Sequence, residues 1–123
     1  MPHLKLEYTK NLRGFDEEAA LLQLNKALAG SGHFDEIDIK SRAVALDHFV
    51  IGTAPNKRAF VHAKLSLMSG RTPDIKKSLS MMLLEELKSI YPSSPDTHIQ
   101  LCVEILEINR EIYAKAVVQP TLP

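Results

Sequence analysis

One pattern of strand, helix and strand occurs twice along the chain, and this repeat restricts the fold more than any other sequence feature. His3-x-Lys5-Leu6 opens the first unit, and His62-x-Lys64-Leu65 lies in the opening strand of the second. A helical pattern begins a similar distance downstream of each match, at Asp16 and at Thr72. A spacing shared by strand and helix start indicates a duplicated β-α-β unit.

The first unit is outlined by the spacing of its apolar residues. Residues 3–9 alternate polar and apolar side chains, which predicts a strand. Apolar residues recur at helical spacing from Asp16 to about Ala29, with acidic residues in the first turn and Gly30 as a stop. Residues 37–51 mix alternation with β-branched residues and predict one long or broken strand, closed by the turn residues 52–56.

The second unit follows the same plan. Residues 59–68 alternate again and predict a strand that ends at residues 69–71. Thr72 is the expected N-cap of a second helix, which Pro92 and Pro95 terminate. Residues 99–108 predict a last strand, and the tail through Pro120 and Pro123 is expected to be a loosely held arm.

These elements predict an α+β, two-layer fold. Right-handed crossovers give two parallel strand pairs in one four-stranded sheet, with both helices on one face. We expect a single domain over residues 1–123, with units at about 2–52 and 58–108 and an arm at 109–123. The other sheet face is expected to be apolar and to need cover, so we infer subunit association.

Charge and composition exclude several classes of function. Lys and Arg number 15 and Asp and Glu also number 15, so there is no basic excess for nucleic acid. No apolar run is long enough to cross a membrane and the N-terminus lacks the pattern of a signal peptide, so we expect a cytoplasmic protein. The single cysteine, Cys102, allows no internal disulfide and is expected to be buried and inert in a strand.

The sequence predicts neither a metal nor a nucleotide cofactor. The five histidines lack the H-x-x-x-H spacing and have no neighbouring cysteine or carboxylate cluster. The five glycines are scattered at turns and form no phosphate-binding motif.

Pro2 is the sharpest candidate for catalysis. Removal of Met1 before a small residue would leave Pro2 with a secondary amine at the edge of the first strand. Burial or nearby cations would favour the neutral form of this amine, which could then act as a base. The alternative is a Met-Pro start without any function.

Three cationic residues are candidates for binding an anionic substrate. Lys40 and Arg42 are two apart on an expected strand and therefore share one face. Arg71 stands in the turn before the second helix, beside backbone N–H groups that attract anions. Arginine grips a carboxylate with two hydrogen bonds and stabilises a developing enolate. The alternative for each residue is a solvated surface charge.

Four separated motifs carry a resemblance to a known family. They are residues 2–8 (PHLKLEY), 39–42 (IKSR), 59–62 (AFVH) and 70–72 (GRT), in order over about the first three-quarters of the chain. In these motifs the chain resembles 5-carboxymethyl-2-hydroxymuconate isomerase of the tautomerase superfamily. The resemblance implies a duplicated β-α-β monomer, a homotrimer, no cofactor, and a cytoplasmic role in aromatic catabolism through the homoprotocatechuate pathway.

The resemblance also implies roles for individual residues. In that family the N-terminal proline moves a proton between carbons of a dienol to form a conjugated ketone, and arginines bind the substrate carboxylates. Carried over, Pro2 is the base, and Arg71, Arg42 and Lys40 bind the small anionic substrate. The family commonly has arginine where this chain has Lys40. Two other interpretations stay open: another tautomerase activity, such as that on phenylpyruvate, or a catalytically silent trimeric binding or structural protein.

Overall fold

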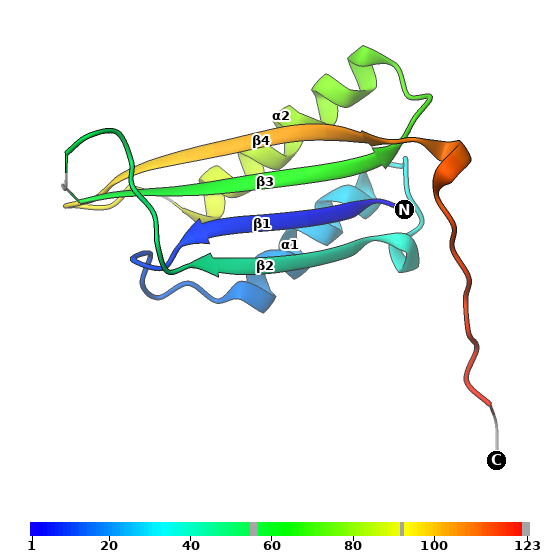
Figure 1. The fold of residues 1–123 in the computed structure, drawn as a ribbon, viewed down its shortest axis with the longest axis horizontal. Helices are drawn as coiled ribbons and strands as arrows, with labels where there is room; N and C mark the ends of the chain where they lie inside the picture. Colours follow the sequence, from blue (N-terminus) through cyan, green and yellow to red (C-terminus); the bar gives the residue numbers. More distant parts are fainter. Residues whose placement is uncertain (55–56, 92, 122–123) are drawn as a thin grey trace.

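The computed structural model describes residues 1–54, 57–91 and 93–121, which form one sheet and two long helices (Figure 1). The strands are β1 (His3–Thr9), β2 (Lys40–Leu46), β3 (Arg58–Met68) and β4 (His98–Ile108), and the helices are α1 (Glu17–Gly30) and α2 (Pro73–Ile90). Two short 3₁₀ helices, η1 (Glu36–Asp38) and η2 (Arg110–Ile112), precede β2 and follow β4.

The sheet has the topology that the duplicated unit predicts. Its strand order is β2-β1-β3-β4, with β1 parallel to β2, β3 parallel to β4, and β1 antiparallel to β3. Both helices lie behind the sheet in Figure 1, on a single face. The predicted fold class is therefore confirmed. The antiparallel centre places the start of β1 beside the end of β3, where His3 pairs with Ser66.

Side-chain caps set the start of both helices. The Asp16 carboxylate accepts a hydrogen bond from the Ala19 N–H at 3.1 Å, and the Thr72 hydroxyl accepts one from the Ile75 N–H at 3.3 Å. The N-cap predicted at Thr72 is therefore confirmed. The sequence predictions for Pro55, Asn56, Pro92 and Pro123 fall outside the described residues.

The core lies between the two helices and the sheet face on which they pack. Alternate residues of β1 and β3 are fully buried, and each helix contributes one stripe of leucines. Its largest apolar members are Leu4, Leu6, Val61, Leu65, Leu67, Leu24, Leu28, Leu79, Leu83 and Leu87. Because every second residue of the two central strands is inside, a register shift of one residue would expose this whole set.

The strand expected over residues 37–51 is much shorter in the structure. Glu36–Asp38 is a 3₁₀ helix, and only Lys40–Leu46 pairs in the sheet. The reason is the length of the partner strand, because β1 ends at Thr9, which lies opposite Leu46. Beyond that point no neighbouring ladder remains for the chain to extend.

The open face of the sheet is mixed rather than apolar as expected: it carries charged pairs, and also Val44 and Leu106, which are 42% and 40% exposed. Glu7 pairs with Lys64 at 3.1 Å, and His62 lies 2.9 Å from Glu104. These residues alternate with the buried ones, so each central strand has one apolar and one polar side. Cys102 is exposed, so the prediction of a buried thiol is wrong. It alternates with Leu101 and Val103, which face the helices.

The C-terminal segment is held more firmly at its start than predicted. The Asn109 side chain caps η2, and the Arg110 guanidinium donates to the Ser69 carbonyl at 3.1 Å. Lys115 pairs with Asp38 at 2.8 Å. Beyond Lys115 the chain runs away from the body of the molecule (Figure 1), and Val118 is 94% exposed. The expectation of a loosely held arm is therefore wrong for its first residues.

Neither helix in the described part of the chain combines the length and the apolar character needed to cross a membrane.

Candidate functional site

A cavity of about 390 Å³ lies at the end of the sheet where β1 begins. Its walls come from three places that are far apart in sequence: the loop after α1, the turn before α2 and the segment after β4. The antiparallel pairing of β1 and β3 brings these places together. The lining residues are Met1, Gly32, His33, Phe34, Asp35, Asp38, Met68, Arg71, Arg110 and Lys115.

Positive charge predominates in this cavity. Its lining carries three cationic side chains, Arg71, Arg110 and Lys115, against the two carboxylates of Asp35 and Asp38, and Met1, which bears the chain's amino group, also lines it. Such an excess favours a small anion as the occupant. No group of three or more His, Cys, Asp or Glu side chains in the described residues could hold a metal ion.

Pro2 is buried directly behind Met1. Its carbonyl accepts a hydrogen bond from the Lys40 N–H at 3.1 Å, which ties the start of β1 to the start of β2. The amino group of Met1 donates to the Asp38 carbonyl at 3.0 Å. While Met1 is attached, the Pro2 nitrogen is a tertiary amide and cannot act as a base.

The surroundings of the chain's amino group favour its neutral form. Burial lowers the pKa of this amine, and Lys40 lowers it further by repulsion, whereas Asp38 acts in the opposite direction. The Lys40 ammonium donates to the Asp38 carbonyl at 2.7 Å, so the ammonium and the amine share one acceptor oxygen. The Lys115 ammonium holds the Asp38 carboxylate at 2.8 Å and keeps the pKa of that carboxyl below its usual range.

Arg71 is oriented by two contacts inside the cavity. Its guanidinium donates to the His33 carbonyl at 3.0 Å and lies 4.8 Å from the centre of the Phe34 ring. Gly70 has a φ of 115°, a conformation that favours glycine, and this turn leads directly into Arg71. A guanidinium has five N–H donors, so the contact with His33 leaves others for an anion.

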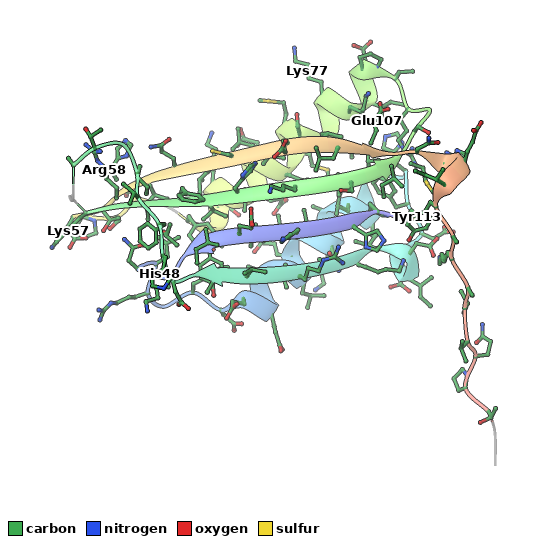
Figure 2. The ribbon with its side chains drawn as sticks, viewed as in Figure 1. His48, Lys57, Arg58, Lys77, Glu107 and Tyr113 are labelled. Atoms are coloured by element: carbon green, nitrogen blue, oxygen red, sulfur yellow. The ribbon has the colours of Figure 1, made fainter. Side chains whose placement is uncertain are left out.

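Arg42 points elsewhere, along the open face of the sheet. Its Nη1 donates to His3 Nδ1 at 3.2 Å, because a guanidinium has only donors. His3 is therefore the neutral tautomer that donates from Nε2 to the Tyr113 hydroxyl at 2.9 Å. Burial, Arg42 and Lys40 together lower the pKa of His3, in agreement with this neutral form. Figure 2 shows Tyr113 beside the start of β1.

A match over nearly the whole chain decides the family. The family model described as 5-carboxymethyl-2-hydroxymuconate isomerase matches residues 2–119. The chain belongs to this family. It is therefore an isomerase of the tautomerase superfamily, as the sequence motifs predicted.

Solved structures agree with this assignment. A 5-carboxymethyl-2-hydroxymuconate isomerase from Deinococcus radiodurans R1 is 29% identical, with a TM-score of 0.85, covering 94% of this chain and 88% of that one. A 5-carboxymethyl-2-hydroxymuconate delta-isomerase is 20% identical, with a TM-score of 0.80 over 96% and 89% of the two chains. A fused 4-OT symmetric trimer, 18% identical with a TM-score of 0.69, covers 93% and 91% and shares the fold. A comparison with curated proteins gives no match.

Of the four site residues predicted from the sequence, Arg71 alone lines the cavity, and Pro2 and Lys40 adjoin lining residues. Pro2 lies behind Met1, Lys40 contacts Asp38, and Arg71 lines the wall. Arg42 is two residues from Lys40 on β2 but contacts His3 and is not among the cavity-lining residues.

Sequence reasoning missed Asp38, Arg110 and Lys115. Asp38 and Lys115 are 77 residues apart, and no local pattern connects them. The one local signal was that Asp38 is an acid two residues before Lys40.

A second, larger cavity of about 800 Å³ lies at the opposite end of the sheet. Its walls come from the turn before α1 and the segment after α2, and Lys57, labelled in Figure 2, marks this end. Its charges balance, with Arg13 and Lys57 against Asp16 and Asp96. Lys57 and Asp96 pair with each other at 3.0 Å. This larger cavity offers no excess charge to an anionic substrate.

Proposed function

We propose that this isomerase catalyses the keto–enol, 1,3-allylic tautomerisation of 5-carboxymethyl-2-hydroxymuconate, with Pro2 as the base, in the homoprotocatechuate branch of aromatic catabolism in the cytoplasm. The observation that carries the proposal is the position of the chain start: Met1 lines a cavity that three cationic side chains, Arg71, Arg110 and Lys115, also line. A base surrounded by cations suits the removal of a proton from a multiply charged anion.

The proposed mechanism begins with removal of Met1, which turns the Pro2 nitrogen into a secondary amine. Pro2 is buried and contacts Lys40 through its carbonyl, so we expect burial and the Lys40 charge to favour the neutral base there, as they do for the Met1 amine. The Pro2 nitrogen takes a proton from one position of the dienol and returns it at another carbon, so the enzyme ends with the protons it began with. No cofactor enters this scheme.

The cations supply the binding and the electrostatic stabilisation. Arg71, already oriented by His33 and Phe34, holds a substrate carboxylate or the developing enolate. Lys40 attracts a second negative group as a point charge. Arg42 faces the open side of the sheet, so it would serve a pocket that a neighbouring subunit completes.

We propose a homotrimer in which the open sheet faces of three subunits meet. Support comes from the shared fold with a fused 4-OT described as a symmetric trimer, and from the strand face that no helix covers. Charged pairs on that face, such as Glu7 with Lys64, are suited to contacts between subunits. Light scattering at micromolar concentration is expected to give three times the monomer mass, and a stable monomer would contradict the assembly.

A pH profile of untagged, Met1-processed protein tests the proposed base. We expect kcat/KM to rise with deprotonation of one group, with a midpoint below the ordinary 8.0 of a chain-terminal amine. Pro2→Ala keeps an amine at this place but changes its basicity, so the midpoint is expected to move and the activity to fall. A profile that is unchanged in Pro2→Ala would remove Pro2 from the mechanism.

A substrate panel separates the remaining candidates. The excess of cations in the cavity favours a dicarboxylate or tricarboxylate over phenylpyruvate, which carries a single carboxylate. Turnover of 2-hydroxymuconates and phenylpyruvate by the same preparation ranks the two substrate classes. Native protein that retains Met1 in an intact-mass measurement, and that is inactive on both, would favour a catalytically silent binding protein.

A further inference from the structure

Asp38 connects three charged groups at the start of β1. Its main-chain carbonyl accepts from the chain's amino group at 3.0 Å and from the Lys40 ammonium at 2.7 Å. Its carboxylate accepts from the Lys115 ammonium at 2.8 Å. One residue of η1 therefore joins the chain terminus, β2 and the C-terminal segment around the Met1 amine, and Pro2 is next to it, with its carbonyl accepting from the Lys40 N–H at 3.1 Å.

We propose that Lys115 is a positioning residue of this isomerase: through its ion pair with Asp38, it keeps the cluster around the N-terminal base cationic. The inference rests on the proposed role of Pro2. It assigns a function to the segment after β4, which contributes nothing to the repeated β-α-β units.

The argument depends on the balance of charges that face the amine. Lys40 comes from β2, Asp38 from η1, Lys115 from the C-terminal segment and His3 from β1 itself. With Lys115 present, Asp38 is neutralised and Lys40 remains as the dominant charge. Without Lys115, an unpaired carboxylate would stand beside the amine and stabilise its protonated form. The other charged residues at the cavity wall are Asp35, Arg71 and Arg110.

The position of Lys115 is set by contacts along its own segment. Arg110 donates to the Ser69 carbonyl at 3.1 Å, and the Tyr113 hydroxyl accepts from His3 at 2.9 Å. These contacts bring the chain back along the starts of β1 and β2, so Lys115 reaches Asp38 from a segment that is fixed at two earlier points. The C-terminal end of the chain then extends away from the sheet (Figure 1).

The test follows the ionisation of the Pro2 nitrogen in processed protein labelled with ¹⁵N-proline, by NMR titration, together with the pH profile of kcat/KM. Lys115→Gln removes the charge, and its expected effect is a rise in the pKa of the amine by about half a unit to one unit, since the pair is partly exposed. Activity is then expected to fall threefold to tenfold below the midpoint and to change little above it.

Three further variants test whether the shift in the midpoint comes from the charge of the Lys115–Asp38 pair. Asp38→Asn in the Lys115→Gln background removes the uncompensated carboxylate, so the midpoint is expected to return toward wild type. Lys115→Arg is expected to keep the wild-type midpoint because it keeps the charge. Lys88→Gln is the matched control: it removes the same charge from an exposed pair with Glu85 on α2, and no shift is expected.

The outcomes separate this inference from the proposed function. A loss of activity in Lys115→Gln that is equal at all pH values, or a higher KM with an unchanged midpoint, would overturn the positioning role. An unshifted Pro2 titration in Lys115→Gln would do the same, even when Pro2 proves to be the base. A pH profile that is the same in Pro2→Ala as in wild type contradicts the proposed function instead, and it does so whatever the result for Lys115→Gln.

Discussion

Because β1 and β3 run antiparallel, their starting residues lie at opposite ends of the sheet, and each end has a cavity built in the same way. Each cavity is walled by the turn before one helix and the segment after the other. Arg71 stands in the turn before α2, and Arg13 stands in the turn before α1. The duplication of the β-α-β unit has therefore produced two related ends of one molecule.

The two ends differ in charge and in the free chain terminus. The smaller cavity has three cationic side chains against two carboxylates, whereas the charges of the larger one balance. Pro2 opens the first unit, and the equivalent position of the second unit is Val61, a buried residue inside a continuous strand. The volume of a cavity therefore does not identify the candidate active site in this molecule. The informative feature is the group of charged side chains beside the chain's amino group.

The largest effect is expected from blocking the chain terminus. Retention of Met1, or an N-terminal extension, acylates the Pro2 nitrogen and removes its basic lone pair. We expect kcat/KM to fall at least about a hundredfold, as for loss of a general base. An assay paired with intact-mass measurement checks this, and circular dichroism is expected to show an unchanged fold. Full activity of an extended protein would abolish the distinction between the two ends.

Equivalent arginines at the two ends provide the second test. Arg71→Ala is expected to lower kcat/KM on a dicarboxylate or tricarboxylate by about 2–4 kcal/mol, because a charged donor is lost beside the substrate. Arg13→Ala, at the related turn, is expected to leave kcat/KM unchanged. Steady-state kinetics of both variants on one substrate is the measurement. Equal losses in the two variants would show that the assignment of the site to one end is wrong.

A pair of lysines sharpens the same contrast with a smaller effect. Lys40→Gln is expected to cost about 1 kcal/mol in kcat/KM, since an ammonium is a flexible point charge. Lys57→Gln removes an exposed pair with Asp96 at the other end, and its kinetics are expected to match wild type. Should Lys57→Gln prove the more damaging of the two, the substrate binds at the larger cavity.

The smallest effect concerns stability at the two ends of β1. The pKa of His3 is lowered in the folded state, chiefly by burial and Arg42, so the unfolded state binds a proton first as the pH falls. Stability is therefore expected to fall on acidification below about pH 6.5, by less than about 1 kcal/mol. At the other end of β1, burial raises the pKa of Tyr8 to about 12, so stability is expected to fall above about pH 10.

Urea denaturation across this pH range measures both effects. His3→Asn is expected to reduce the loss on acidification, and Tyr8→Phe to reduce the loss at alkaline pH. An acid loss that is unchanged in His3→Asn would assign the titration to another group.

Local physics explains why the fold could be predicted so fully. The apolar alternation of β1 and β3 depends only on neighbours within a few residues, and so do the caps at Asp16 and Thr72. Such features can be recognised in a single sequence. The predicted length of β2 was wrong because it depends on the length of the strand with which β2 pairs. β2 ends at Leu46 because β1 ends opposite it, and no property of residues 47–51 reveals that limit.

The candidate site was predicted in part, for the same reason. Pro2 and Arg71 stand in sequence contexts with chemical meaning of their own, a chain start and a helix N-terminus. Lys115 and Arg110 have no such context, because their roles depend on a segment that returns to the start of β1 after the last strand. The direction of Arg42 toward His3 was likewise set by strand register rather than by spacing along β2.

By itself, the sequence determined the duplicated unit, the topology of the sheet and the family, because repetition, periodicity and motif spacing are properties of the chain alone. Tertiary structure decided which of the two related cavities gathers an excess of cations, since that excess sums groups from the turn before α2, from η2 and from the C-terminal segment. Coulombic interactions depend on distance in space. Residues 77 positions apart can therefore share one carboxylate, and only the folded chain shows that Asp38 and Lys115 do.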